Sequence, residues 1–112
     1  MSRYGRGAKA EHECIEDLLA NHGFVYALRS AGSHGVADIV AFRYRSGRLS
    51  FEQPTEAHLV AVRSGKRPGH SPAERAELLE QANRIGAEAW EWLCKRNGNG
   101  RKPTITFRRI TE

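Results

Sequence analysis

A nearly continuous apolar run from Val36 to Phe42 constrains the fold of this chain more than any other segment. Only Asp38 interrupts the run, so a strand formed there would present apolar side chains on both of its faces. This pattern is typical of a strand in a sheet that is covered on both sides. The run therefore predicts a buried strand inside an α/β domain.

The remaining segments supply the other elements of such a domain. Apolar spacing predicts a helix from Lys9 to His22, and Ser71-Pro72-Ala73-Glu74 has the capping-box pattern that begins a second helix. Strand patterns occupy residues 24–29, 36–42, 58–63, 87–93 and 104–110, with a short extra strand expected at 49–53. The expected order is α-β-β-β-α-β-β, an α/β sandwich with a central mixed sheet. Residues 1–8 are small, polar and basic, which favours a flexible arm.

Length and charge narrow the class of protein. The 112 residues predict one domain spanning 1–112, and no apolar run approaches the roughly 20 residues of a membrane span. The N-terminus lacks an apolar signal core, so we expect a cytoplasmic protein with no membrane partner. Eighteen Lys and Arg against 13 Asp and Glu give a net charge of +5, which indicates a polyanionic partner. Cys14 and Cys94 belong to no CxxC pair and are expected to be reduced, buried thiols.

Asp38 and Glu11 are the acids that the pattern singles out. A carboxylate inside an apolar strand is costly to bury, so Asp38 needs a backbone or Arg partner, or a metal ion. Glu11 lies near the helix face that carries Cys14 and Leu18, so it points partly inward. Carboxylate oxygens are ligands that Mg²⁺ prefers. Two roles therefore remain open for Asp38, that of a structural residue and that of a metal ligand.

Polar and basic residues flank these acids. The loop that contains Arg29, Ser30, Ser33 and His34 has the composition of a phosphate-holding loop, although an ordinary turn has the same one. Residues 63–67 and 95–109 hold clusters of Lys and Arg that suit contact with backbone phosphates, or that simply face solvent. Trp90 and Trp92 are expected in the core or a dimer interface, with stacking on bases as the alternative.

Four segments in this order carry a resemblance to a known family: residues 6–11, 29–41, 60–64 and 71–75. Together they resemble the archaeal-type Holliday junction resolvases and their phage and bacterial relatives, in the PD-(D/E)XK nuclease superfamily. The likeness runs from about Ser2 to Ile85, and RSAGSHG-x-ADIVA is its most specific part. It implies a restriction-endonuclease-like fold, a homodimer, and a Mg²⁺- or Mn²⁺-dependent endonuclease that cuts four-way or branched DNA.

The resemblance also implies roles for individual residues. Glu11 and Asp38 correspond to the metal ligands. The implied catalytic residues are Glu11, Asp38, Arg63, Ser33 and Arg29, and the implied DNA-binding residues are Arg3, Arg6, Lys9, Ser30, His34, Lys66 and Arg67.

The third metal-site element departs from the family pattern. Ala61 stands where the family has an acid or Gln, and Arg63 stands where it has Lys. Residues 44–57 resemble an insertion, and Glu52 or Glu56 within it is a candidate to replace the missing ligand. Two functions therefore stay open: an active endonuclease, and a catalytically inactive DNA-binding or regulatory module. A merely basic protein-interaction domain explains neither Asp38 nor the order of the motifs.

Overall fold

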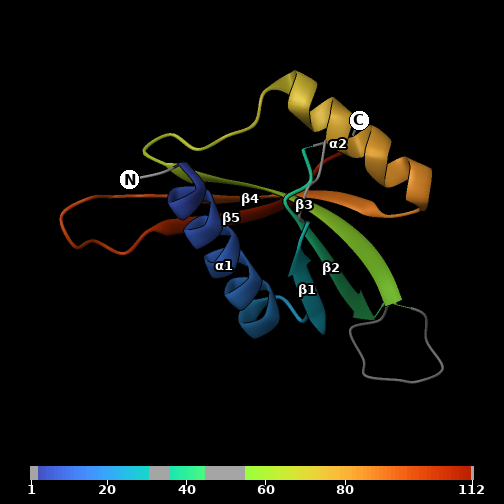
Figure 1. Ribbon diagram of the computed structural model, residues 1–112, viewed down its shortest axis with the longest axis horizontal. Helices are drawn as coiled ribbons and strands as arrows, with labels where there is room; N and C mark the ends of the chain where they lie inside the picture. Colours follow the sequence, from blue (N-terminus) through green and yellow to red (C-terminus); the bar gives the residue numbers. More distant parts are fainter. Residues whose placement is uncertain (1–2, 31–35, 45–54, 112) are drawn as a thin grey trace.

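A mixed five-stranded sheet lies between two helices in the computed structural model, which describes residues 3–30, 36–44 and 55–111 (Figure 1). The elements are α1 (Arg3–Asn21), β1 (Tyr26–Arg29), β2 (Ile39–Tyr44), β3 (Thr55–Gly65), α2 (Pro72–Ile85), β4 (Glu88–Lys95) and β5 (Thr104–Arg109). The strand order is β1-β2-β3-β4-β5, with β3 and β4 parallel and the other neighbours antiparallel. The predicted α/β class, element order and mixed sheet are confirmed.

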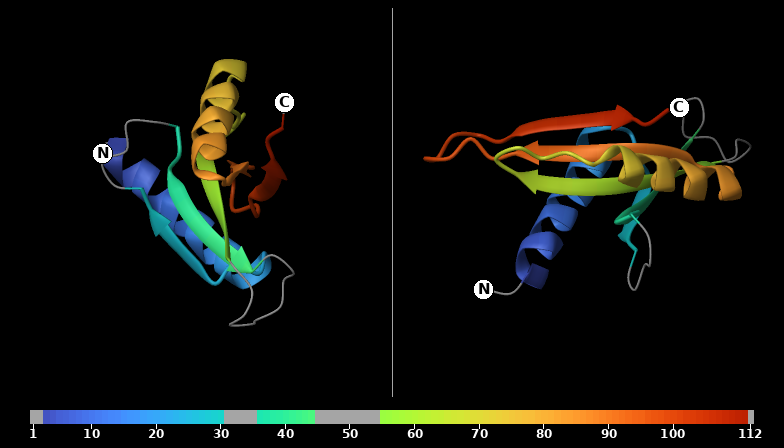
Figure 2. Two further views of the ribbon diagram at one scale, coloured as in Figure 1. Left: turned by 90° about the vertical axis from the view of Figure 1, so that its right-hand side faces the viewer. Right: turned by 90° about the horizontal axis from the view of Figure 1, so that it is seen from above.

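The two helices cover opposite faces of the sheet (Figure 2). On one face, Ala10, Cys14 and Leu18 of α1 pack against residues that include Val60 and Trp92. On the other face, Leu78 and Ala82 of α2 pack against small residues of the sheet. Because both faces are covered, the middle of β3 is apolar and buried at every position.

The buried tryptophan and cysteine side chains belong to the α1-facing core. Trp92 is 1% exposed, and its indole Nε1 donates to Asp17 at 2.9 Å, so it packs in the core and does not stack on bases. Trp90 is partly buried and stacks on Phe107. Cys14 and Cys94 are buried free thiols, as expected, and burial raises the pKa of both.

Helix α2 begins where the sequence predicts. The Ser71 hydroxyl accepts from the Glu74 amide at 3.1 Å, and the Glu74 carboxylate accepts from the Ser71 amide at 3.0 Å, which completes the capping box. At the other end, Gly86 adopts a left-handed conformation with φ of 71°. This fixed N-terminus places His70 and Glu74 beside the end of β3.

The N-terminal part of the chain differs from the prediction. Helix α1 begins at Arg3, so residues 3–8 are helical where we expected a flexible arm. Packing of Ala10 and Cys14 against the sheet holds a helical nucleus, and adding further turns to an existing helix costs little, even with Gly5 and Gly7 present.

The ends of the segment predicted as an insertion, residues 44–57, belong to regular strands. Tyr44 is the last residue of β2 and pairs with Thr55 at the start of β3, so both ends of this segment belong to an antiparallel hairpin. The short strand expected at 49–53 lies outside the described residues. Strand β2 is also less buried than predicted, because Val40 and Phe42 are only half-buried.

Neither described helix is both long and apolar enough to cross a bilayer.

Candidate functional site

Asp38 lies just before β2, where three backbone segments meet. Its amide donates to the Val60 carbonyl at 2.9 Å, and its carbonyl accepts from the Ser30 amide at 2.9 Å. Its carboxylate Oδ2 accepts from the Val62 amide at 2.8 Å. These bonds hold the half-buried carboxylate against β3, opposite Ala61. Burial raises the pKa of Asp38, and the Val62 hydrogen bond opposes that effect.

Glu11 reaches the same region from α1. Its carboxylate Oε2 lies 3.4 Å from Nη2 of Arg29, at the end of β1. The negative charge of Glu11 raises the pKa of Asp38, and both acids raise the pKa of the Cys14 thiol. A second carboxylate that makes Asp38 harder to ionise marks a place where a cation is stabilised. Their oxygen donors fit the preference of Mg²⁺ and Mn²⁺.

Ala61 stands where the resembled family has its third metal ligand, and its methyl group cannot bind a metal ion. Ala61 is fully buried in the α2-facing core. Arg63, two residues on, is exposed and forms an ion pair with Glu74 at the N-terminus of α2. Its positive charge lowers the pKa of Asp38, whose carboxylate accepts from the amide of Val62, the residue before Arg63. The site therefore contains two acids and a cation that Glu74 anchors.

Glu56 does not replace the missing ligand at Ala61. It precedes Ala61 along β3 by roughly 16 Å, at about 3.3 Å per residue. The two residues also face opposite sides of the sheet, because side chains alternate along a strand. That suggestion is therefore wrong for Glu56, and Glu52 lies outside the described residues.

A buried network beside Ala61 is what the sequence analysis missed. Glu91 pairs with Ala61 across β3 and β4, and it is 1% exposed. Its carboxylate accepts from His70 Nδ1 at 3.1 Å and Arg108 Nε at 2.7 Å, and it forms an ion pair with Arg75 at 3.1 Å. Burial raises the pKa of Glu91, but the Arg108 and His70 hydrogen bonds outweigh it, so the pKa is lowered.

The signal for this network was present in the strand pattern. Glu91 shares the face of β4 that carries Ala89 and Leu93, and an acid on an inward face needs partners. Asp38 bonds to Val60 and Val62, the two neighbours of Ala61, and Glu91 pairs with Ala61 from the other side. The network therefore connects the N-terminus of α2 to the sheet beside the candidate site.

The basic residues predicted to contact DNA lie on several elements. Lys9 is exposed on α1, and Ser30 is half-buried after β1. Lys66 and Arg67 are exposed after β3 and line a hollow of about 240 Å³ together with Lys95 and Thr104. Arg3 and Arg6 lie on the first turns of α1, but their side chains are outside the described part. Ser33 and His34 lie in residues 31–35, which are also outside it.

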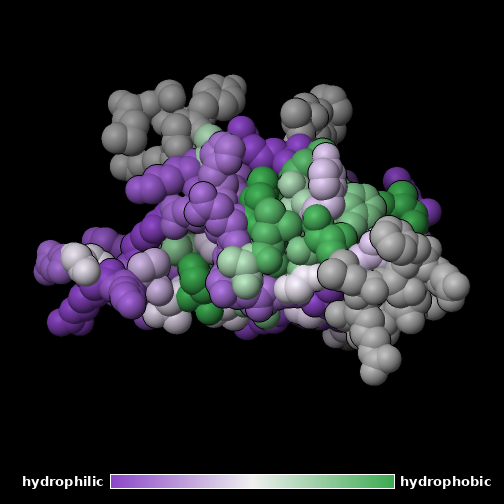
Figure 3. All heavy atoms as spheres, turned by 90° about the horizontal axis from the view of Figure 1, so that it is seen from below, coloured by the Kyte–Doolittle hydropathy of each residue, from purple (hydrophilic) through white to green (hydrophobic). Residues whose placement is uncertain are grey.

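Only some of the basic side chains at 95–109 form ion pairs within the protein. Arg96 is held by Glu13 at 2.7 Å and Arg108 by Glu91. Lys95, Arg101 and Lys102 are exposed at the end of the molecule formed by the β4–β5 connection, which is hydrophilic on the face shown in Figure 3.

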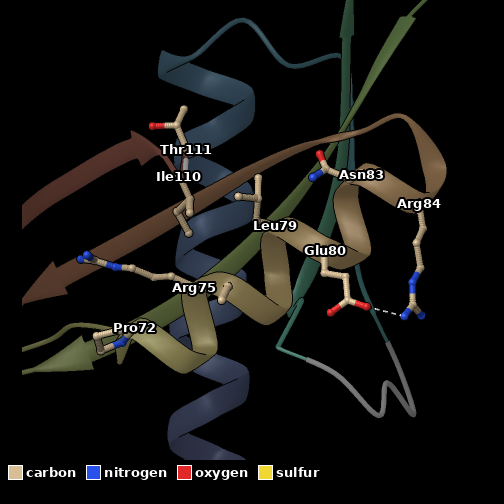
Figure 4. Close-up of a pocket in the computed structure, with 9 residues that line it drawn as sticks. Pro72, Arg75, Leu79, Glu80, Asn83, Arg84, Ile110 and Thr111 are labelled. Atoms are coloured by element: carbon tan, nitrogen blue, oxygen red, sulfur yellow. Dashed lines mark hydrogen bonds and ion pairs between the residues drawn. The ribbon is translucent and has the colours of Figure 1, made fainter.

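A second hollow lies along α2, away from the two acids. It has a volume of about 710 Å³, and Leu79 and Ile110 lie against it while Glu80 and Arg84 pair at its rim (Figure 4). Neither Glu11 nor Asp38 lines it.

The fold matches that of a known nuclease. The structure is similar to that of Hjc, a Holliday junction resolvase from the hyperthermophilic archaeon Archaeoglobus fulgidus, with a TM-score of 0.65. The match covers 94% of this chain and 73% of that chain, with 24% sequence identity. No protein-family model matches the chain, and no curated protein matches its sequence. The comparison therefore establishes a shared fold.

Proposed function

We propose that this chain is a Holliday junction resolvase-like protein that binds branched DNA and cuts its phosphodiester bonds with Mg²⁺ or Mn²⁺. The observation that carries the proposal is the half-buried Asp38 carboxylate, which is fixed to the Val62 amide and is acted on by the charges of Glu11 and Arg63. This acid pair lies on the fold of an archaeal resolvase.

Each residue of the site has a proposed role. Glu11 and Asp38 would hold the metal ion, which supplies a nucleophilic water and charge stabilisation when bound. Arg63 faces the scissile phosphate and stabilises negative charge there, but it cannot act as a base because guanidinium keeps its proton. Arg29 and Ser33 position the phosphate backbone.

The DNA surface surrounds this site. Proposed backbone contacts come from Arg3, Arg6, Lys9, Ser30, His34, Lys66 and Arg67. Among the residues that the structure describes, Lys66 and Arg67 support this DNA surface, because both are exposed and line a hollow. Contacts of this kind are electrostatic and largely independent of sequence.

The proposal includes a homodimer acting in the cytoplasm. Resolution of a four-way junction needs two symmetric cuts, which a twofold dimer supplies. A cytoplasmic location, in a cell or in the host of a phage, follows from the DNA substrate.

A second candidate function is DNA binding without cleavage. The specific observation that favours it is Ala61, which is buried where the third ligand would stand. Anchoring of Arg63 by Glu74 also reduces the charge available to a phosphate.

One experiment separates the two functions. The purified protein is incubated with labelled four-way junction and with linear duplex, in Mg²⁺, in Mn²⁺ and in chelator. Symmetric nicks in the junction that require metal, disappear in Asp38→Asn and persist in the control Glu80→Gln support the nuclease. Tight junction binding with no cleavage in either metal supports the binding module instead. No binding to either DNA, together with no cleavage, contradicts both.

A further inference from the structure

A histidine and two acids gather at the far end of β3 from Asp38, on the opposite face of the sheet from Ala61. One ligand atom each from Glu56, His58 and Glu88 lies within 4.8 Å of the others. His58 and Glu88 pair across β3 and β4, and His58 Nε2 lies 3.3 Å from Glu88 Oε1. The mechanism proposed above uses none of these residues.

The hydrogen bonding of His58 fixes where its proton is. Nδ1 lies 3.1 Å from the backbone carbonyl of Glu56, and a carbonyl oxygen only accepts, so Nδ1 carries the hydrogen. In a neutral imidazole, Nε2 then has a lone pair. This is the arrangement of a metal-binding histidine, in which a backbone carbonyl orients the ring through the other nitrogen.

The other ring nitrogen of His58, Nε2, is buried beside an atom that repels its lone pair. His58 is 0% exposed, and its Nε2 has no hydrogen-bond partner. Nε2 lies 3.3 Å from the Glu88 Oε1 oxygen but makes no hydrogen bond to it, so two acceptors lie side by side.

The separation of the two acceptors suits a small dication. Two ligands at about 2.05 Å from a tetrahedral zinc ion lie about 3.3 Å apart. The observed 3.3 Å between Nε2 and Oε1 agrees with that spacing. The Trp90 indole donates to the same Glu88 oxygen at 2.9 Å, which holds the carboxylate in place.

The surrounding charges are compatible with a bound dication. Two carboxylates face the site, and two arginines lie beside it. The Arg43 guanidinium lies over the rings of Phe24 and Trp90, and Arg109 is 3.9 Å from the other oxygen of Glu88. Glu56 and Glu88 are only half-buried, so an ion can reach the cluster.

We infer that Glu56, His58 and Glu88 form a second metal site that binds a zinc-class transition-metal ion with one nitrogen and two oxygen ligands. The mixed donor set favours zinc over magnesium, which prefers oxygen alone. Because the ligands come from β3 and β4, the ion would fasten the beginnings of these strands together. The site is independent of the proposed nuclease chemistry.

The test uses the full chain in the Asp38→Asn background, which removes the carboxylate of the other candidate site. The protein is stripped with chelator and titrated with Zn²⁺ by calorimetry and with Co²⁺ by visible absorption. We expect one equivalent, a tetrahedral cobalt spectrum and a higher melting temperature with zinc. Glu88→Gln and His58→Gln should each weaken zinc binding at least tenfold, whereas Glu80→Gln, an exposed acid on α2, should not.

Two results would overturn the inference. One is the absence of stoichiometric binding to a stripped protein that circular dichroism shows to be folded. The other is zinc affinity in Glu88→Gln equal to that of its parent. Should His58→Gln fail to fold, the half-exposed Glu88→Gln variant still decides the question. A ¹⁵N spectrum showing a protonated His58 Nε2 in the metal-loaded protein would likewise contradict it.

Discussion

Replacing Glu91 with Gln tests the buried network beside the candidate site. The substitution keeps the shape of the side chain but removes its charge and replaces one acceptor oxygen with a donor. The Glu91 side chain is 2% exposed and has His70, Arg75 and Arg108 as partners. At least one of these donors would then face the amide NH₂ of the new residue.

The expected loss of stability follows from the burial and charge of these contacts. Breaking a buried ion pair costs about 3–5 kcal/mol, and a hydrogen bond to a charged group is worth about 1.5–3 kcal/mol. Arg75 and Arg108 are 39% and 52% exposed, so each can turn toward water and recover part of the loss. We therefore expect Glu91→Gln to lower the free energy of unfolding by about 2–4 kcal/mol.

The pH dependence gives a second readout. The folded pKa of Glu91 lies below its ordinary value, so its contribution is present at neutral pH and is lost as pH falls through the folded pKa. The difference between Glu91→Gln and the parent should therefore shrink with acidification. Urea denaturation followed by Trp90 and Trp92 fluorescence measures it at each pH.

A matched control separates the network from a generic loss of charge. Glu80 forms an exposed pair with Arg84 one helical turn away, so Glu80→Gln should cost only about 0.3–0.5 kcal/mol. If Glu91→Gln costs no more than this control, or if its cost does not change with pH, the reasoning about the network is refuted.

Three further predictions concern the site, the surface and α2. Ala61→Glu should give or increase Mn²⁺ binding by calorimetry while costing about 2–4 kcal/mol in a urea melt, because it places an acid in a packed core; unchanged metal affinity would contradict the assigned geometry. Lys66→Ala with Arg67→Ala should weaken junction binding and reduce the slope of log affinity against log salt by about 2; a slope equal to the parent's would exclude phosphate contact there. Ser71→Ala should destabilise the protein by about 1 kcal/mol, since it removes the capping box; an unchanged denaturation midpoint would show that the cap is dispensable.

The sequence predicts the helices and strands better than the contacts between them. The apolar periods and the Ser71 cap are local signals, so the order of helices and strands and the start of α2 follow from them. The pairing of Asp38 with Glu11 could be anticipated only through the family resemblance, since the residues lie on different elements.

The missed features depend on register between distant strands. That Glu91 lies next to Ala61 follows from the parallel pairing of β3 and β4, which no local pattern specifies. The same register brings Glu88 to His58. The early start of α1 at Arg3 was missed because Gly5 and Gly7 are poor helix formers, and helix propagation from a packed nucleus overrode that preference.

The alanines at the contact between α2 and the sheet have a consequence for how this protein can evolve. Ala37, Ala61, Ala82 and Ala89 all belong to the α2-facing core, so helix and sheet meet there through small side chains. A larger residue at position 61 must displace that contact before it can serve any ligand. A chain with this packing reaches an acid at 61 only through a less stable intermediate, unless its neighbours change first. Selection for stability alone is therefore enough to keep an alanine, which cannot bind a metal ion, at position 61.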